Sequence, residues 1–281
     1  MRAILLALSL LTATPALAAQ PWLTLPPTPT LPKADVSGLA PVNGIKLWYA
    51  EFGQSSGLGE PVLLVHGGLA NSDYWGNQVR ALVAAHYKVI VMDSRGHGRS
   101  SRNAEPYGYD LMASDVVALL DYLKIPKVAL IGWSDGAIIG LDIAMHHPER
   151  LTRLFAFAAN YDPSGVANAP SAVVDQYIAR AGKEYEAHSP TPKEYKSFVA
   201  QITHMWDSQP HWTKDDLAKI RVHTWIADGD RDEMVRHDQP RTLADWVPDS
   251  GLLIEPEVSH FAFLQNPGQF NADILRFLKS K

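Results

Sequence analysis

Short apolar runs alternate with stretches of helically spaced apolar residues from about residue 42 to the end of the chain. A continuous run such as Val62–Val65 predicts a strand buried on both faces, whereas apolar residues at i, i+3 and i+4 predict a helix. The predicted strands span residues 44–52, 61–65, 88–92, 127–131, 151–159, 221–227 and 252–255, and the predicted helices span 79–85, 111–123, 137–145 and 273–278. This alternation predicts an α/β fold with a mostly parallel central sheet and helices on both faces.

Residues from about 161 to 219 interrupt this alternation. They contain no evident strand, but they contain several helix starts. Thr191-Pro192-Lys193-Glu194 has the form of a capping box with proline at the first helical position, and residues 213–220 predict another helix. We therefore predict a helical cap inserted over the carboxyl edge of the sheet. The substrate pocket is expected to include one or two of three cap side chains, Met205, Trp206 and Trp212.

Residues 1–18 have the pattern of a secretory signal peptide. Arg2 supplies a basic end, residues 3–11 are apolar, and Ala16-Leu17-Ala18 has the small-x-small form of a cleavage site. The apolar stretch is too short to span a bilayer. An N-terminal helix of the folded domain is the alternative. The signal predicts that the protein is periplasmic or secreted.

Five prolines follow the signal peptide between residues 21 and 32. They predict an extended arm over residues 19–41 that is not part of the core, followed by the folded domain over residues 42–281.

The composition excludes several kinds of protein and partner. The chain has no cysteine, so disulfides cannot stabilise it even after export. The net charge is −5, and no cluster of Lys and Arg stands out, which argues against a nucleic-acid partner. No later apolar run is long enough for a membrane span. The expected partner is therefore a small molecule, and the sequence leaves the oligomeric state open.

Gly132-Trp133-Ser134-Asp135-Gly136 is the most informative segment. It lies between a predicted strand and a predicted helix, which is the context that the G-x-S-x-G nucleophile elbow requires. The turn strains the backbone of Ser134 and exposes its hydroxyl, while the following helix directs its N-terminus at the same point. An ordinary glycine-rich loop is the alternative.

A serine hydroxyl needs a base to remove its proton, and the base needs an acid to orient it. In an elbow fold the acid and then the histidine follow the serine along the chain. His260 follows the last predicted strand, which places it at the same edge as Ser134. Asp232 follows the preceding strand, and it is our first choice of acid over Asp230 in the same loop.

An oxyanion needs N–H donors. We expect one from the backbone of Asp135 and the other from the segment His66-Gly67-Gly68-Leu69, with Gly68 as first choice and Leu69 as second. His66 is expected to brace this loop by hydrogen bonds. Leu69 and Trp133 are also predicted to line the substrate pocket.

Competing motifs are incomplete. Gly96-His97-Gly98 follows a strand but lacks the third glycine of a dinucleotide fingerprint. The sequence contains no phosphate-binding loop, no H-E-x-x-H and no cysteine cluster, so we expect neither a metal nor another cofactor.

The chain resembles the α/β-hydrolase family over about residues 42–281. The resemblance rests on His66-Gly67-Gly68, residues 93–100, residues 132–136, residues 229–232 and His260. It implies a serine hydrolase that cleaves carboxylic esters or related acyl compounds through an acyl-enzyme, without a cofactor. A perhydrolase or a C–C bond hydrolase with the same triad is the alternative within the family. A catalytically silent binding protein is the alternative outside enzymes.

The residue after the nucleophile has two interpretations. The Gly-Trp-Ser-Asp-Gly form is similar to that of an amino-acid-ester hydrolase of the family, in which the acid helps to hold the substrate ammonium. This resemblance implies that Asp135 favours cationic substrates. The alternative is that Asp135 caps its helix and complements the helix dipole.

Overall fold

The computed structural model of the chain describes residues 20–53, 60–167 and 169–280. The predicted signal peptide lies outside these residues. In the described part, eight strands form one sheet in the order β1-β2-β4-β3-β5-β6-β7-β8. The strands are β1 (Val36–Val42), β2 (Ile45–Phe52), β3 (Val62–Val65), β4 (Val89–Met92), β5 (Val128–Trp133), β6 (Leu151–Phe157), β7 (His223–Gly229) and β8 (Gly251–Glu255).

The sheet is mostly parallel. Strand β2 pairs antiparallel with β1 and β4, whereas the pairings from β4 through β8 are parallel. Every residue of β3 and β4 is buried, which explains why their sequences are continuous apolar runs. The predicted fold class is confirmed.

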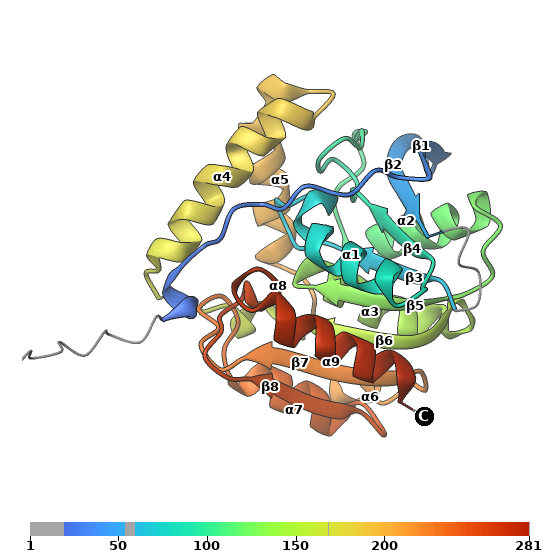
Figure 1. Ribbon diagram of the computed structural model, residues 1–281. Helices are drawn as coiled ribbons and strands as arrows, with labels where there is room; N and C mark the ends of the chain where they lie inside the picture. The colour runs from blue at the N-terminus through green and yellow to red at the C-terminus, as the bar shows by residue number, and fades with distance from the viewer. Residues whose placement is uncertain (1–19, 54–59, 168, 281) are drawn as a thin grey trace, which may run out of the picture.

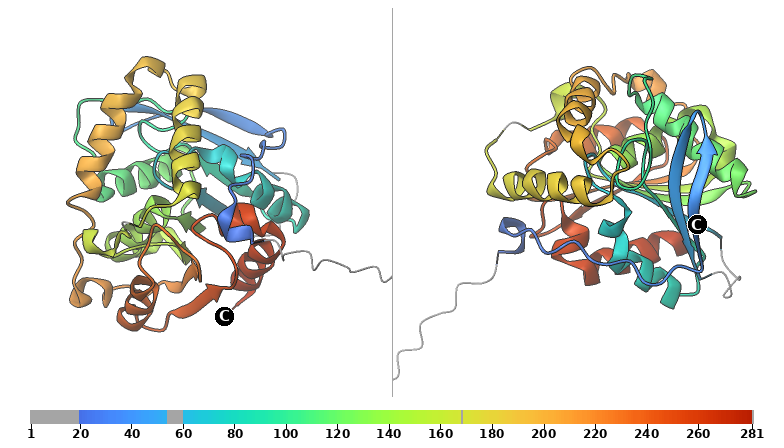
Figure 2. Two further views of the ribbon diagram at one scale, coloured as in Figure 1. Left: turned by 90° about the vertical axis from the view of Figure 1, so that its left-hand side faces the viewer. Right: turned by 90° about the horizontal axis from the view of Figure 1, so that it is seen from above.

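Helices cover both faces of the sheet (Figures 1 and 2). The helices are α1 (Gly76–Ala84), α2 (Tyr109–Tyr122), α3 (Asp135–His146), α4 (Ala172–His188), α5 (Tyr195–Trp206), α6 (Lys214–Leu217), α7 (Asp238–Trp246), α8 (Ala262–Gln265) and α9 (Pro267–Lys279). Alternate residues of β3 serve the two faces: Val62 and Leu64 pack with α1 and α9, and Leu63 and Val65 pack with α2 and α3. None of these helices in the described ranges is long and apolar enough to cross a membrane.

Two local expectations differ from the structure. Sequence periodicity misses α7, because its buried residues are Gln239, Pro240 and Leu243, a face too polar to form an apolar stripe. The capping box expected at Thr191 is wrong. The hydroxyl of Thr191 contacts the hydroxyls of Tyr185 and Ser189 instead of capping a helix.

The boundary expected between the arm and the folded domain is also wrong. Strand β1 begins at Val36 and pairs with β2 along all seven of its residues. The proline-rich part is attached as well, since Arg180 of α4 donates to the carbonyl oxygens of Leu25 and Pro26 at 2.9 and 2.5 Å. The strand escapes prediction because it lies at the sheet edge, where Pro41 is tolerated and the apolar alternation is weak.

Helices α4 and α5, with the 3-10 turn Pro192–Glu194 between them, form the element that we call the cap. The cap stands beside the body formed by the sheet and its flanking helices (Figures 1 and 2). Helix α6, which lies within the range expected for the cap, instead packs against α3 and α7 and buries Leu217. The cap is therefore shorter than expected, because the chain returns to the body before β7.

Candidate active site

Ser134 stands at the sharp turn between β5 and α3. Its φ of 54° and ψ of −120° lie in a region that residues other than glycine rarely adopt. Such strain costs on the order of 1–3 kcal/mol and is concentrated at functional sites. The carbonyl oxygen of Phe157, at the end of β6, accepts the amide N–H of Ser134 at 2.9 Å. Neighbouring strands therefore hold the serine in its strained conformation.

The glycines on either side of Ser134 let three elements converge. A Cβ on Gly132 would collide with the carbonyl of Gly136, and a Cβ on Gly136 would collide with the carbonyl of Val65 at the end of β3. Both obstacles are backbone groups, which cannot rotate away as a side chain would. The two glycines of the motif therefore permit close backbone contact at this turn.

A cavity of about 130 Å³ lies beside Ser134, and its walls are mostly apolar. The loop after β3, the turn after β5, the cap and the loop after β8 all contribute to it. Ser134 and His260, which are far apart in the sequence, both line this cavity, and so do Gly68 and Asp135.

His260 is paired with Asp232. Nδ1 of His260 lies 2.7 Å from Oδ2 of Asp232, and both side chains are buried. The other oxygen of Asp232 accepts the backbone N–H groups of Met234 and Val235, each at 2.7 Å. Asp230, the second candidate, pairs with Arg231 at 3.7 Å instead. Asp232 is therefore the acid that the fold brings to His260.

Burial and charge act in opposite directions on this pair. Burial alone would lower the pKa of His260, but the carboxylate of Asp232 and its hydrogen bond outweigh burial and raise that pKa. Burial alone would raise the pKa of Asp232, but the charge of the imidazolium and the hydrogen bonds lower it. Asp232 therefore stays ionised, as a group that stabilises an imidazolium must.

Asp228, at the end of β7, is a buried carboxyl group beside Asp232 that sequence reasoning missed. One of its oxygens accepts the N–H of Gly229 at 2.8 Å, and the other meets no donor within the described residues. Burial and the charge of Asp232 raise the pKa of Asp228 well above its usual range. Burial and the neighbouring negative charge therefore both favour the protonated form of Asp228 over the ionised form.

His66 orients the peptide that carries the N–H of Gly68. Nε2 of His66 accepts the N–H of Ser94 at 2.9 Å, so the ring proton is on Nδ1, which donates to the carbonyl of Gly67 at 2.7 Å. Burial lowers the pKa of His66, which keeps the ring neutral. In a trans peptide the C=O and the next N–H point in opposite directions. The bond to Gly67 thus fixes the direction of the Gly68 N–H.

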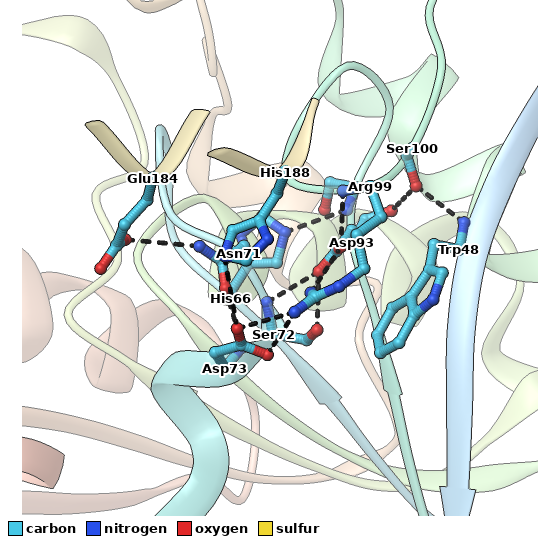
Figure 3. A network of polar contacts seen from close by, with 11 residues as sticks. Trp48, His66, Asn71, Ser72, Asp73, Asp93, Arg99, Ser100, Glu184 and His188 are labelled. Carbon is cyan, nitrogen blue, oxygen red and sulfur yellow. Dashed lines mark hydrogen bonds and ion pairs between the residues drawn. The ribbon is translucent and has the colours of Figure 1, made fainter. Parts of the chain in front are cut away.

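A buried aspartate anchors the far end of the same loop. Asp93, after β4, accepts the N–H and the hydroxyl of Ser72 at 2.8 and 2.6 Å, and the guanidinium of Arg99 at 3.1 Å (Figure 3). Arg99 in turn pairs with Asp73 at 2.7 Å. The loop that follows β3 is therefore fastened to the body at both ends.

Asp135 is the first residue of α3, so its N–H has no acceptor within the helix. Its carboxylate accepts the hydroxyl of Tyr109 at 2.8 Å and the indole N–H of Trp206 at 3.0 Å. It forms no side-chain cap on α3, so the capping part of that alternative is wrong, whereas its place in the first turn of α3 suits the helix dipole. Burial raises the pKa of Asp135 to about 6.

Three of the five side chains predicted for the pocket line the cavity: Leu69, Trp133 and Trp206. Met205 and Trp212, both in the described part of the chain, do not, so these two candidates are wrong, whereas Trp206 meets the expectation that one or two of the three line the pocket. Met205 is buried in the core, because adjacent helical residues point about 100° apart and Trp206 takes the direction of the cavity. Trp212 lies beyond the cap helices and packs against the core. Sequence reasoning missed several lining side chains, Tyr109, Asn160, Val166, Tyr177, Ile178, Gln209, Met234 and Val235.

Among the described residues, no three His, Asp or Glu side chains are grouped as a metal site would require.

The topology and the strained serine define a class of protein. A family model described as the α/β-hydrolase fold matches residues 60–193. A meta-cleavage product hydrolase from Pseudomonas fluorescens has the same fold, with a TM-score of 0.74 and 22% identity over 87% of this chain and 97% of that one. This chain has the α/β-hydrolase fold.

Sequence relatives are more varied. The chain is 29% identical to a putative non-heme chloroperoxidase from Synechocystis, over 84% of this chain and 95% of that protein. It is 28% identical to human serine hydrolase BPHL, over 82% of each chain. A shorter match, 40% identical, covers 39% of this chain and 40% of 3-oxoadipate enol-lactonase 2 from Acinetobacter baylyi. These relatives support a hydrolase in general and leave the substrate open.

Proposed function

We propose that this protein is a serine hydrolase that cleaves carboxylic esters or related acyl compounds. The observation that carries the proposal is that Ser134 and His260 line one mostly apolar cavity and that His260 is paired with Asp232 behind it. The strained backbone of Ser134 supports it, because strain of this size persists where function requires it.

In the proposed reaction, Oγ of Ser134 attacks the acyl carbon while His260 removes its proton. The N–H groups of Gly68 and Asp135 bind the oxyanion. His260 then protonates the leaving alcohol, and the acyl-enzyme forms. Water, deprotonated by His260, attacks the acyl-enzyme and releases the acid. Asp232 orients His260 and stabilises its cation throughout.

A fluorophosphonate probe tests the nucleophile, since Oγ of an activated serine displaces fluoride from its phosphorus. We expect one label on the mature protein, located on Ser134 by mass spectrometry, and loss of labelling after heating. An active protein that carries the label elsewhere, or no label, would contradict the proposal. A panel of esters with increasing acyl length, assayed with water and with hydrogen peroxide as acceptor, then separates an esterase from a perhydrolase.

We also propose that Asp135 favours substrates with a positive charge near the scissile carbonyl. Its carboxylate lies on the cavity wall and is held by two neutral donors, Tyr109 and Trp206. A buried carboxylate with neutral partners leaves a negative potential in an apolar cavity, and a substrate ammonium would compensate it. The similarity of the Gly-Trp-Ser-Asp-Gly segment to an amino-acid-ester hydrolase supports the same preference.

Replacing Asp135 with asparagine tests this preference, because Oδ1, which accepts from both Tyr109 and Trp206, is retained. We expect kcat/KM for an amino-acid ester to fall about tenfold relative to a neutral ester of equal length, a difference of about 1.4 kcal/mol. Because the pKa of Asp135 is about 6, the wild-type preference for the cationic ester should increase as the pH rises from 5 to 7. Equal losses on both esters would refute the preference. Asp142→Asn, a buried aspartate on the same helix, is the control.

A further inference from the structure

One face of helix α4 meets the loop that carries Gly68. Tyr177 donates its hydroxyl hydrogen to the carbonyl of Gly68. Glu184 and His188, later in the same helix, also contact this loop. Glu184 accepts a hydrogen bond from the side-chain amide of Asn71 at 3.3 Å, and His188 lies 3.7 Å from Asp73 (Figure 3). The spacing of these helical residues places them on a common face. The cap therefore contacts this loop at three points, in addition to the anchor that Asp93 provides.

Gly68 is the position where the loop most needs such support. A Cβ there would collide with Trp206 and would lie 2.7 Å from Oδ2 of Asp135, so any larger residue would displace these two side chains from the site. Glycine is also the residue with the greatest backbone freedom. The requirement for space therefore creates a flexible point at the proposed oxyanion donor.

Two hydrogen bonds remove this flexibility. The peptide before Gly68 is fixed by His66, whose ring donates to the carbonyl of Gly67. The peptide after Gly68 is fixed by Tyr177, whose hydroxyl donates to the carbonyl of Gly68. The first peptide limits φ of Gly68 and the second limits ψ, because each torsion is the rotation of one of these planes about the Cα.

We propose that Tyr177 is a positioning residue: it fixes the peptide between Gly68 and Leu69 and so, together with His66, keeps the backbone at Gly68 from turning its N–H away from an oxyanion. This inference rests on the proposed function, in which that N–H stabilises the tetrahedral intermediate. The hydroxyl of Tyr177 acts only on the backbone of the loop and does not touch the reacting atoms. Its loss should therefore weaken transition-state binding and leave ground-state binding nearly unchanged.

The surroundings of Tyr177 suit this role. The side chain is 3% exposed and packs against Tyr74, Trp133 and Phe261, which fix the ring. Burial raises the pKa of Tyr177 well above its usual value, so the hydroxyl remains a donor over the working pH range.

Tyr177→Phe removes the donor and keeps the ring. We expect kcat for the best neutral ester to fall about 10- to 100-fold, less than the loss from deleting an oxyanion donor, with KM within about twofold of the wild type. Inhibition by a simple alkylboronic acid, which forms a tetrahedral adduct with the serine oxygen, should weaken in proportion to kcat. A purely structural role would not produce this split between kcat and KM.

Tyr185→Phe is the matched control. Tyr185 lies on the same helix and is equally buried, but its hydroxyl contacts Thr191 and not the loop. Thermal denaturation of both variants shows whether each remains folded. If the wild type hydrolyses esters and Tyr177→Phe behaves like Tyr185→Phe, this inference is wrong and the proposed function stands. If the wild type has no hydrolase activity and no label on Ser134, the proposed function itself has failed.

Discussion

Replacing Ser134 with alanine is expected to lower kcat by about 10⁴- to 10⁶-fold, because the variant lacks the hydroxyl that is proposed to form the acyl-enzyme. The fold should be unaffected, since alanine retains the Cβ and the hydroxyl makes no hydrogen bond that stabilises the turn within the described structure. Steady-state hydrolysis of a neutral ester measures the effect. Thermal denaturation should give a Tm within a few degrees of the wild type.

Ser164→Ala serves as the control, because Ser164 is an ordinary serine in a short 3-10 turn. Its kcat should equal that of the wild type. If Ser134→Ala retained near-normal rates of hydrolysis, the proposal that Ser134 is the nucleophile would be wrong, even though the fold is that of an α/β-hydrolase.

The second large effect is expected from Asp232→Asn. Asparagine keeps the shape of the side chain but removes the charge that stabilises the imidazolium, so kcat should fall about 10³- to 10⁴-fold. Asp230→Asn makes the same chemical change in the same loop. It should alter kcat little, because Asp230 pairs with Arg231 and not with His260. Equal losses in the two variants would contradict the assignment of the acid.

The pH dependence of kcat/KM provides an independent test of the interaction between His260 and Asp232. His260 must be neutral to act as a base, so the rate rises with pH through the pKa of His260. The charge of Asp232 raises that pKa, whereas burial lowers it. Asp232→Asn removes the largest influence that raises the pKa of His260 and leaves the smaller ones of Glu233 and Asp135 against burial, so the acid limb of kcat/KM should move to lower pH. A shift to higher pH would contradict this electrostatic account.

Much of the body of the protein could be predicted because its signals are local. The central strands are buried on both faces, and such strands need continuous apolar runs such as Val62–Val65. The elbow was predictable for a similar reason, because a strained turn between a strand and a helix needs small residues at fixed spacing around Ser134.

Elements at the periphery were harder to predict. Strand β1 pairs on one side only and tolerates Pro41, and α7 buries Gln239 and Pro240, so neither has a clear apolar period. The cap residues near the pocket show most clearly what sequence patterns fail to predict. Met205 and Trp206 are adjacent and similarly apolar, yet one packs in the core and the other reaches Asp135. The rotation of α5 about its own axis determines which of the two side chains faces the cavity, and the residue types alone do not specify that rotation.

The sequence by itself determined the α/β fold, the turn that holds Ser134 and the chain order of the groups that could assist it, because these depend on short-range patterns of apolar residues and glycine. Only the tertiary structure decided that Asp232 and not Asp230 meets His260, and that Tyr177 and Trp206 reach down from the cap. The physical reason is that hydrogen bonds form over about 3 Å and depend on angle. Residues far apart in sequence satisfy such limits only after the sheet, the loops and the cap have been placed in space.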